Sequence, residues 1–209
     1  MFEIEYKGGN TVVIATKKSK LITDPKQSLI GLKDIDPKNM ISLATEPRFE
    51  VPSAESVLAI EGPGEYEVGD FSIRGIAAQR HLDSDGKGST IYRIEVGDVR
   101  IALLGNIDPK LTEEQLESIG VIDIVILPVG GGGYTLDATS AAQLVRKIDA
   151  KTVIPIHYAD KALKYEVPQD EFETFHKELG GEVETVDKLK VKTASALPLV
   201  STIYKLARS

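Results

Sequence analysis

The first half of the chain has the hydrophobic pattern of short strands separated by turns. Apolar and polar residues alternate over Phe2–Tyr6, the period expected of a half-buried strand. Turn signals bound these runs, and Gly97-Asp98 predicts a two-residue hairpin. The strands predicted in this half are Phe2–Tyr6, Thr11–Thr16, Lys20–Thr23, Met40–Ala44, Val57–Ile60, Tyr66–Val68, Phe71–Ala77, Ser89–Val96 and Val99–Leu104.

In the second half, helical and strand periods alternate. Thr112 and Gln115 have the spacing of a capping box at a helix start, and apolar residues recur at helical spacing over Ala138–Ile148 and Pro168–Leu179. The strands predicted here are Val121–Leu127, Thr152–Ile156, Lys188–Lys192 and Leu199–Leu206. The first two are nearly all apolar, so we expect them to be buried, parallel neighbours joined by the helix between them.

Strands first and βαβ units later predict one α/β or α+β domain over residues 1–209, with helices covering sheets. The net charge of −7 argues against nucleic-acid binding. No apolar run approaches the ~18 residues of a membrane span, and the N-terminus lacks the pattern of a signal peptide. Cysteine is absent, which fits a reducing compartment. We therefore expect a cytoplasmic protein without nucleic-acid or membrane partners.

The chain has only three histidines, which limits the chemistry it can perform. His157 follows the strand Thr152–Ile156 directly, where sites of α/β proteins tend to lie. It is a candidate metal ligand or acid–base group, and the alternative is a histidine bonded to a neighbouring loop. His81 lies beside a polar loop, where an exposed histidine is commoner than a ligand. His176 falls on a predicted helix, where a solvated position is expected.

Three further features lie at strand ends or helix starts. Asn106 follows the strand Val99–Leu104 and can bind a substrate or cap a turn, but its neutral amide makes it a poor metal ligand. The run 130–133 is all glycine and sits between a strand and a helix, a context for phosphate binding. It lacks the spacing of a phosphate-binding motif, so a loop at a cavity mouth is favoured. Asp137 most simply caps its helix.

Five segments, by their order and spacing, carry a family resemblance. They are Leu21–Pro25, Gly62–Val68, Leu103–Asn106, Leu127–Ala138 and Pro155–Tyr158. Together they resemble the metallo-β-lactamase fold, in the branch of metal-dependent hydrolases that includes ascorbate-phosphate lactonase. The resemblance runs from about Ile4 to Leu206. It implies a four-layer αββα sandwich with a site at the sheet edges, where the loops meet.

Enzymes of this family hold one or two metal ions that activate water. The resemblance aligns their first metal-binding segment with Thr45–Val51, where Glu46 and Arg48 replace the leading histidines. It further aligns the family's bridging aspartate, late histidine, intermediate histidine and a nearby aspartate with Asn106, His157, His81 and Asp137.

These departures predict the loss of the usual metal site. A catalytic zinc needs about three protein ligands. Arg48 also places a positive charge where a cation would bind, which costs ~4 kcal/mol per unit charge at 4 Å and an effective dielectric constant of ~20. We therefore expect no metal cofactor. The expected site cluster is Arg48, His81, Asn106, Asp137 and His157, and its charge favours a small anionic molecule.

Three functions are left open by this pattern. The leading expectation is a ligand-binding or scaffold module with a degenerate metal site. The alternative is a hydrolase of a lactone or phosphoester, with one zinc or manganese ion held by His81, His157 and an acid, either Asp137 or Glu50. The third is a structural subunit that forms a homo-oligomer.

Overall fold

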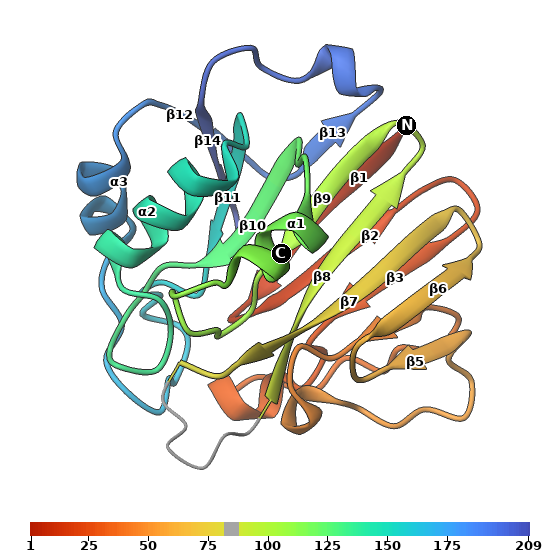
Figure 1. Ribbon diagram of the computed structural model, residues 1–209. Helices are drawn as coiled ribbons and strands as arrows, with labels where there is room; N and C mark the ends of the chain where they lie inside the picture. Colours follow the sequence, from red (N-terminus) through yellow and green to blue (C-terminus); the bar gives the residue numbers. More distant parts are fainter. Residues whose placement is uncertain (82–87) are drawn as a thin grey trace.

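In the computed structural model, which describes residues 1–81 and 88–209, two β-sheets pack face to face with α-helices outside (Figure 1). The six-stranded sheet, in the order β13-β1-β2-β3-β4-β5, consists of β1 (Phe2–Gly8), β2 (Thr11–Ala15), β3 (Lys20–Thr23), β4 (Ile41–Leu43), β5 (Leu58–Ile60) and β13 (Leu189–Val191). The eight-stranded sheet, in the order β12-β14-β11-β10-β9-β8-β7-β6, consists of β6 (Gly64–Val68), β7 (Phe71–Gln79), β8 (Gly88–Val96), β9 (Val99–Leu103), β10 (Ile124–Pro128), β11 (Thr152–Ile156), β12 (Glu182–Val186) and β14 (Thr202–Leu206).

The helices are α1 (Glu113–Ile119), α2 (Ala138–Ile148) and α3 (Phe172–Leu179), with the short 3₁₀ helices η1 (Gln27–Ile30), η2 (Pro47–Phe49) and η3 (Ala194–Ala196). The predicted capping box is confirmed, since Gln115 N donates to Thr112 Oγ1 at 3.1 Å and Thr112 N donates to Gln115 Oε1 at 2.9 Å. Within residues 1–81 and 88–209, none of the helices combines the length and the hydropathy that a membrane span requires.

Helix α3 begins at Phe172, four residues later than the predicted start at Pro168. The segment before it is held by neighbouring loops. Asp170 N donates to the Gly130 carbonyl at 2.7 Å, and the Asp170 carbonyl accepts from Ala159 N at 2.9 Å. These two bonds use backbone groups in contacts to other loops and so delay the first helical turn.

Two hydrophobic cores fill the spaces between layers. Side chains alternate along a strand, so Ile126 of β10 points between the sheets while its neighbours Val125 and Leu127 point toward the helices. The second core receives Leu144 of α2 and Phe175 of α3. The two-sheet sandwich with helices outside is thus confirmed, and its strands are buried on both faces where α2 and α3 cover them.

All three α-helices of the described residues contribute to the core on the eight-stranded sheet. The resemblance implies a helical layer over the other sheet as well, and no α-helix within 1–81 and 88–209 forms one. That sheet carries charges that suit water instead. On β1, Glu3 pairs with Lys188 at 2.6 Å and Glu5 pairs with Lys7 at 2.8 Å.

Strands β9, β10, β11 and β14 run parallel. Ile126 of β10 pairs with Ile154 of β11, and α2 connects the two strands, which confirms the predicted βαβ unit. Because parallel strands end at the same edge of a sheet, the residues that follow β9, β10 and β11 meet there. These residues include Asn106 and His157.

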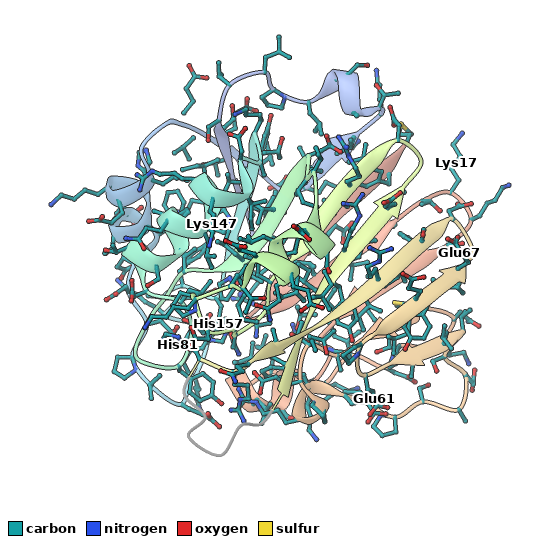
Figure 2. All side chains as sticks on the ribbon, viewed as in Figure 1. Lys17, Glu61, Glu67, His81, Lys147 and His157 are labelled. Carbon is teal, nitrogen blue, oxygen red and sulfur yellow. The ribbon has the colours of Figure 1, made fainter. Side chains whose placement is uncertain are left out.

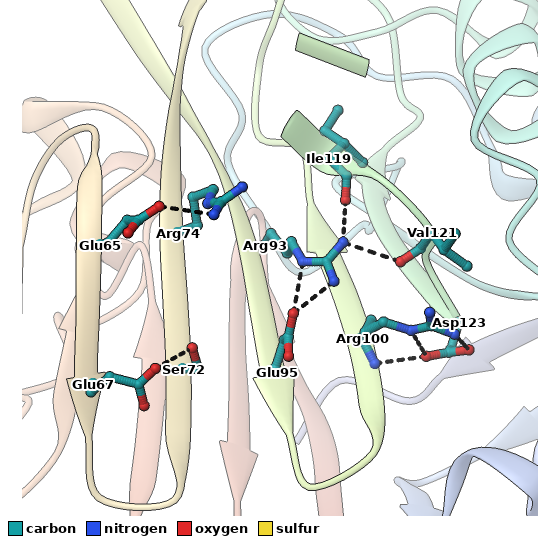
Figure 3. A network of polar contacts seen from close by, with 10 residues as sticks. All are labelled: Glu65, Glu67, Ser72, Arg74, Arg93, Glu95, Arg100, Ile119, Val121 and Asp123. Carbon is teal, nitrogen blue, oxygen red and sulfur yellow. Dashed lines mark hydrogen bonds and ion pairs between the residues drawn. The ribbon is translucent and has the colours of Figure 1, made fainter. Parts of the chain in front are cut away.

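The strand predicted to begin at Val121 begins at Ile124 in the structure, and Val121 is 66% exposed. Its backbone explains the difference. Arg93 of β8 donates to the carbonyls of Ile119 at 2.5 Å and Val121 at 3.2 Å, and so ties the end of α1 to the sheet (Figure 3). Strand β12 was not predicted, because its charged sequence lies at the edge of the sheet.

Leu144 of α2 tests the assignment of the helix face, because its side chain is 2% exposed in the second core. Replacement by alanine is expected to lower the free energy of unfolding by ~2–5 kcal/mol. Urea unfolding measures this loss. The control is Gln143→Ala, because Gln143 precedes Leu144 in the helix but its side chain is exposed. This variant should change the free energy of unfolding by less than ~0.5 kcal/mol. Equal, small losses for both variants would mean that α2 packs on another face.

Candidate functional site

The candidate site lies at one end of the sandwich, where loops from both sheets meet. His157 follows β11 and Asn106 follows β9, while Glu46 comes from the loop after β4 in the other sheet. Figure 2 shows His81 and His157 at this same end of the molecule. His157 and Asp24 have left-handed backbones, with φ of 50° and 46°. This conformation is uncommon in residues other than glycine, although Asp and His adopt it more readily than most, and Asn39 and Asp149 adopt it elsewhere among the described residues.

A buried carboxylate, Glu46, organises the charged groups of the site. It is 1% exposed and accepts from Arg48 Nε at 2.9 Å and from Arg80 Nε at 2.8 Å. Its other oxygen accepts from Asn106 Nδ2 at 3.3 Å. Arg80 and Asn106 follow strands of the eight-stranded sheet, so Glu46 joins the two sheets at this end. Buried charges of this kind are stable only when paired.

The guanidinium of Arg48 lies between two aromatic rings. Its central carbon is 4.5 Å from the ring centroid of Phe49 and 4.6 Å from that of Tyr134. Contacts with ring faces at this range favour a cation and fix the plane of the guanidinium. Its Nη1 also lies 3.8 Å from the carboxylate of Glu166. Arg48 is therefore held in place from three sides.

A cavity of about 30 Å³ lies beside Arg48 and is lined by Leu29, Ile30, Arg48, Phe49, Tyr134, His157, Tyr165, Glu166, Val167 and Gln169. Its size is that of roughly one water molecule. The glycine run forms part of its surroundings, because a Cβ on Gly130 would collide with the carbonyl oxygen of His157 and with the Gln169 side chain. The glycines thus allow the loop before α2 to approach the end of β11.

The imidazole of His157 is buried and oriented. Its Nδ1 lies 2.8 Å from Asn10 Oδ1, and its ring stacks on Tyr165 with centroids 4.8 Å apart. Burial, and then the positive charge of Arg48, lower the pKa of His157 to about 3. The ring is therefore neutral at pH 7. With Nδ1–H donating to Asn10, the lone pair sits on Nε2, where it can accept a hydrogen bond or bind a metal.

The structure joins most of the predicted cluster through hydrogen bonds and shared cavity walls. Arg48 and His157 line the same cavity, and Arg48 reaches Asn106 through Glu46. His81 donates its backbone N–H to the Asn106 carbonyl at 3.1 Å. Asp137 is exposed instead, and its carboxylate accepts from Ser140 N of α2 at 2.8 Å. His176 lies on α3, as expected, and stacks on Phe172.

Buried polar atoms without partners also gather here. Seven such side-chain atoms occur among the described residues, and five belong to residues of this end. They are Asn10 Nδ2, Arg48 Nη2, His81 Nδ1, Asn106 Oδ1 and Tyr134 Oη. Unpaired buried polar groups are rare in proteins, and their concentration marks a place where a ligand or water completes the bonding.

The family model described as a Beta-lactamase superfamily domain matches residues 3–157. This match covers most of the chain and includes the residues of the cluster up to His157. The chain belongs to the metallo-β-lactamase superfamily. A solved structure from Thermotoga maritima, described as a candidate Zn-dependent hydrolase of this superfamily, has the same fold: it aligns with a TM-score of 0.78 and 21% identity over 99% of this chain and 100% of that one.

Two curated relatives come from Pyrococcus. A UPF0173 protein of Pyrococcus furiosus is 32% identical over 104 residues, which cover 49% of this chain and 45% of the relative. A UPF0173 metal-dependent hydrolase of Pyrococcus horikoshii is 32% identical over 124 residues, which cover 57% of this chain and 53% of the relative. The chain therefore spans about half the length of the curated relatives it matches.

These relatives correct two expectations. The leading expectation of a binding or scaffold module is contradicted, because the relative from Pyrococcus horikoshii is named a metal-dependent hydrolase and nothing in the comparisons indicates a lost site. The expectation of no metal cofactor is contradicted for the same reason. Both expectations rested on the residue types at positions aligned with the family's ligands and on the positive charge of Arg48. The alternative, a metal-dependent hydrolase, fits better.

The described residues do not themselves fit the usual donor set of the superfamily. Within 1–81 and 88–209, no three side chains of His, Asp, Glu or Cys gather closely enough to hold a metal ion. The unpaired atoms here are a ring nitrogen, His81 Nδ1, and an amide oxygen, Asn106 Oδ1. The carboxylate nearby, Glu46, already binds two arginines. The set His81, Asp137 and His157 accordingly stays a prediction.

Asp24 is a second buried acid at this end, and sequence reasoning noted it only as part of the segment Leu21–Pro25. Thr45 donates its N–H to Oδ1 and its hydroxyl to Oδ2, both at 2.7 Å. Burial raises the pKa of Asp24 to about 7, although these hydrogen bonds work against the rise. Near neutral pH the carboxyl is thus divided between its charged and neutral forms.

Asp24→Asn tests this assignment through the pH dependence of stability. A carboxyl whose pKa is about 7 folded and ~3.9 unfolded binds its proton more tightly when folded. The contribution of Asp24 to the free energy of unfolding is therefore largest below pH ~4. It declines by about 4 kcal/mol as the pH rises to ~7. The stability of the wild type relative to Asp24→Asn should decline over this range, as measured by urea unfolding at several pH values.

Asp160→Asn provides a control of opposite sign. Burial raises the pKa of Asp160, but the Ala162 N–H and Arg208 outweigh this effect and lower it. The wild type should therefore gain stability relative to Asp160→Asn as the pH rises through the acidic range. If the difference in stability between the wild type and Asp24→Asn did not change with pH, the raised pKa of Asp24 would be contradicted.

Four further site residues were missed by sequence reasoning: Asn10, Arg80, Tyr134 and Tyr165. Asn10 follows Gly8 and Gly9 in a turn signal, and Tyr134 lies in the segment Leu127–Ala138 that carries the family resemblance. Their roles arise from contacts between distant segments, as between Asn10 and His157, and no local pattern encodes these. The position of Tyr134 directly after four glycines was the one available signal.

Proposed function

We propose that this chain is a metal-dependent hydrolase of the cytoplasm that cleaves a small lactone or phosphoester beside His157. Membership of the superfamily and the naming of the relative from Pyrococcus horikoshii support the reaction class. The location of the active site is supported by one observation above all: unpaired buried polar atoms gather around the ends of β9 and β11.

The residues of the site have separable roles in this proposal. His157, neutral and with its lone pair on Nε2, accepts a hydrogen bond from the attacking water or would serve as a metal ligand. Arg48 orients a negatively charged part of the substrate, and Glu46 holds Arg48 in position. We assign no step to a metal ion, because the described residues do not offer its usual donor set.

A substrate panel tests the proposal. Protein purified without chelator is incubated with Zn²⁺ or Mn²⁺ and with lactones, phosphomonoesters and phosphodiesters. We expect turnover of at least one of these classes, above the rate of a mock purification from cells without the protein. Absence of turnover across all three classes in folded, metal-supplemented protein would overturn the proposal.

A further inference from the structure

Two residues that line the cavity each have a buried hydrogen-bond donor without an acceptor. Arg48 uses Nε for Glu46 and Nη1 for Glu166, while its Nη2 is buried without a partner. The hydroxyl of Tyr134, whose ring stacks on that guanidinium, is buried without a partner as well. Both side chains line the same cavity. An unpaired guanidinium N–H is costly to bury, so this arrangement favours an acceptor in the cavity.

The charge of the surroundings favours an anionic acceptor. Glu46 carries one negative charge, and two arginines, Arg48 and Arg80, bind it. Glu166 is 3.8 Å from Arg48 but its side chain is 53% exposed, so solvent screens it. Asp24, with its pKa raised to about 7 by burial, adds only part of a charge near neutral pH. Of the carboxylates in direct contact with Arg48, only Glu46 is buried, and it is shared with Arg80.

The size of the cavity limits what can enter. A volume of about 30 Å³ accommodates roughly one water-sized group, such as an oxygen atom of a carboxylate or phosphate. The rest of a ligand has to lie outside this cavity. The cavity wall also includes His157, so an anionic group held here lies beside the histidine of the proposed site.

We infer that Arg48 and Tyr134 form a subsite for an anionic oxygen of the substrate, carried by a carboxylate or phosphate group. The inference rests on the proposed function, because it specifies which lactones or phosphoesters the enzyme takes. Arg48 supplies the charge and one N–H, and Tyr134 supplies its O–H. Charge-assisted hydrogen bonds of this kind are stronger than neutral ones.

Anion binding by the wild type, Arg48→Gln and Tyr134→Phe tests the subsite independently of hydrolysis. Inorganic phosphate and acetate are the probes. The binding of each is measured separately by isothermal titration calorimetry, in a buffer without phosphate or carboxylate ions. We expect one or both to bind the wild type and to bind Arg48→Gln roughly 10- to 100-fold more weakly. Arg146→Gln, which removes an arginine on α2 that bonds the Glu178 carbonyl, is the matched control and should bind as the wild type does.

Tyr134→Phe keeps the ring over Arg48 and removes only the hydroxyl, so it tests the subsite even if Arg48→Gln fails to fold. It should weaken binding several-fold. The stronger of the two probes identifies the preferred class of anion. No binding to the wild type, or equal binding to Tyr134→Phe, Arg48→Gln and Arg146→Gln, would overturn the inference. Anion binding with this variant pattern but without turnover of any ester would support the subsite and count against the proposed hydrolase.

Discussion

Replacement of Glu46 by glutamine is expected to lower the free energy of unfolding by about 3–5 kcal/mol. The side chain of Glu46 is almost fully buried and binds two guanidinium groups at 2.8 and 2.9 Å. Glutamine has the same shape but no charge, so Arg48 and Arg80 would lose their shared anion in a partly buried setting. Removal of one partner from such a cluster leaves uncompensated charge, which is the costly case.

Urea unfolding followed by circular dichroism measures this loss. The matched control is Glu55→Gln, because Glu55 pairs with Lys38 on the surface with both side chains more than half exposed. That pair should contribute less than ~1 kcal/mol. If Glu46→Gln were as stable as Glu55→Gln, the two arginines would not depend on Glu46, and the description of the site as an ion cluster would be wrong.

Replacement of His157 by glutamine is expected to reduce kcat/KM by at least ~100-fold on whichever ester is turned over. His157 is the histidine that lines the cavity among the described residues, and Asn10 leaves its Nε2 free for chemistry. Glutamine approximates the volume of histidine but does not provide an imidazole nitrogen with a free lone pair. The thermal midpoint of the variant is measured in parallel to separate loss of chemistry from loss of fold.

His176→Gln controls for the removal of a histidine away from the cavity. Its ring stacks on Phe172 of α3, and its Nε2 lies 3.2 Å from the Gly181 carbonyl. This variant should retain turnover within about twofold of the wild type. Retained turnover in a folded His157→Gln variant would place the reaction elsewhere in the molecule.

Much of the fold is predictable where local signals are strong. Helix α2 has the predicted bounds because Asp137 caps its start and its apolar residues keep a helical period. Strand β11 was likewise predicted with the bounds it has. Strand β12 was missed because its stability comes from pairing with β14, a partner distant in sequence, and not from its own charged residues.

The site is predictable only in part. Position at strand ends predicts that His157 and Asn106 lie at the same edge of the sheet, as they do in the structure, because parallel strands bring their ends together. The resemblance identifies Glu46 as the replacement of a metal-binding histidine, whereas the structure shows it bound to Arg48, Arg80 and Asn106. That role depends on contacts across the two sheets, up to 60 positions apart in sequence. Spacing along one segment carries no information about such contacts.

Metal content and hydrolysis measured on a single preparation test the central claim most directly. The protein is purified without chelator, its zinc and manganese are quantified by elemental analysis, and turnover of the best substrate is measured before and after treatment with EDTA. The proposed function predicts that metal and turnover fall together and that Zn²⁺ or Mn²⁺, but not Mg²⁺, restores turnover. Undiminished turnover by metal-free protein, or no turnover by metal-loaded protein, would contradict a metal-dependent hydrolase.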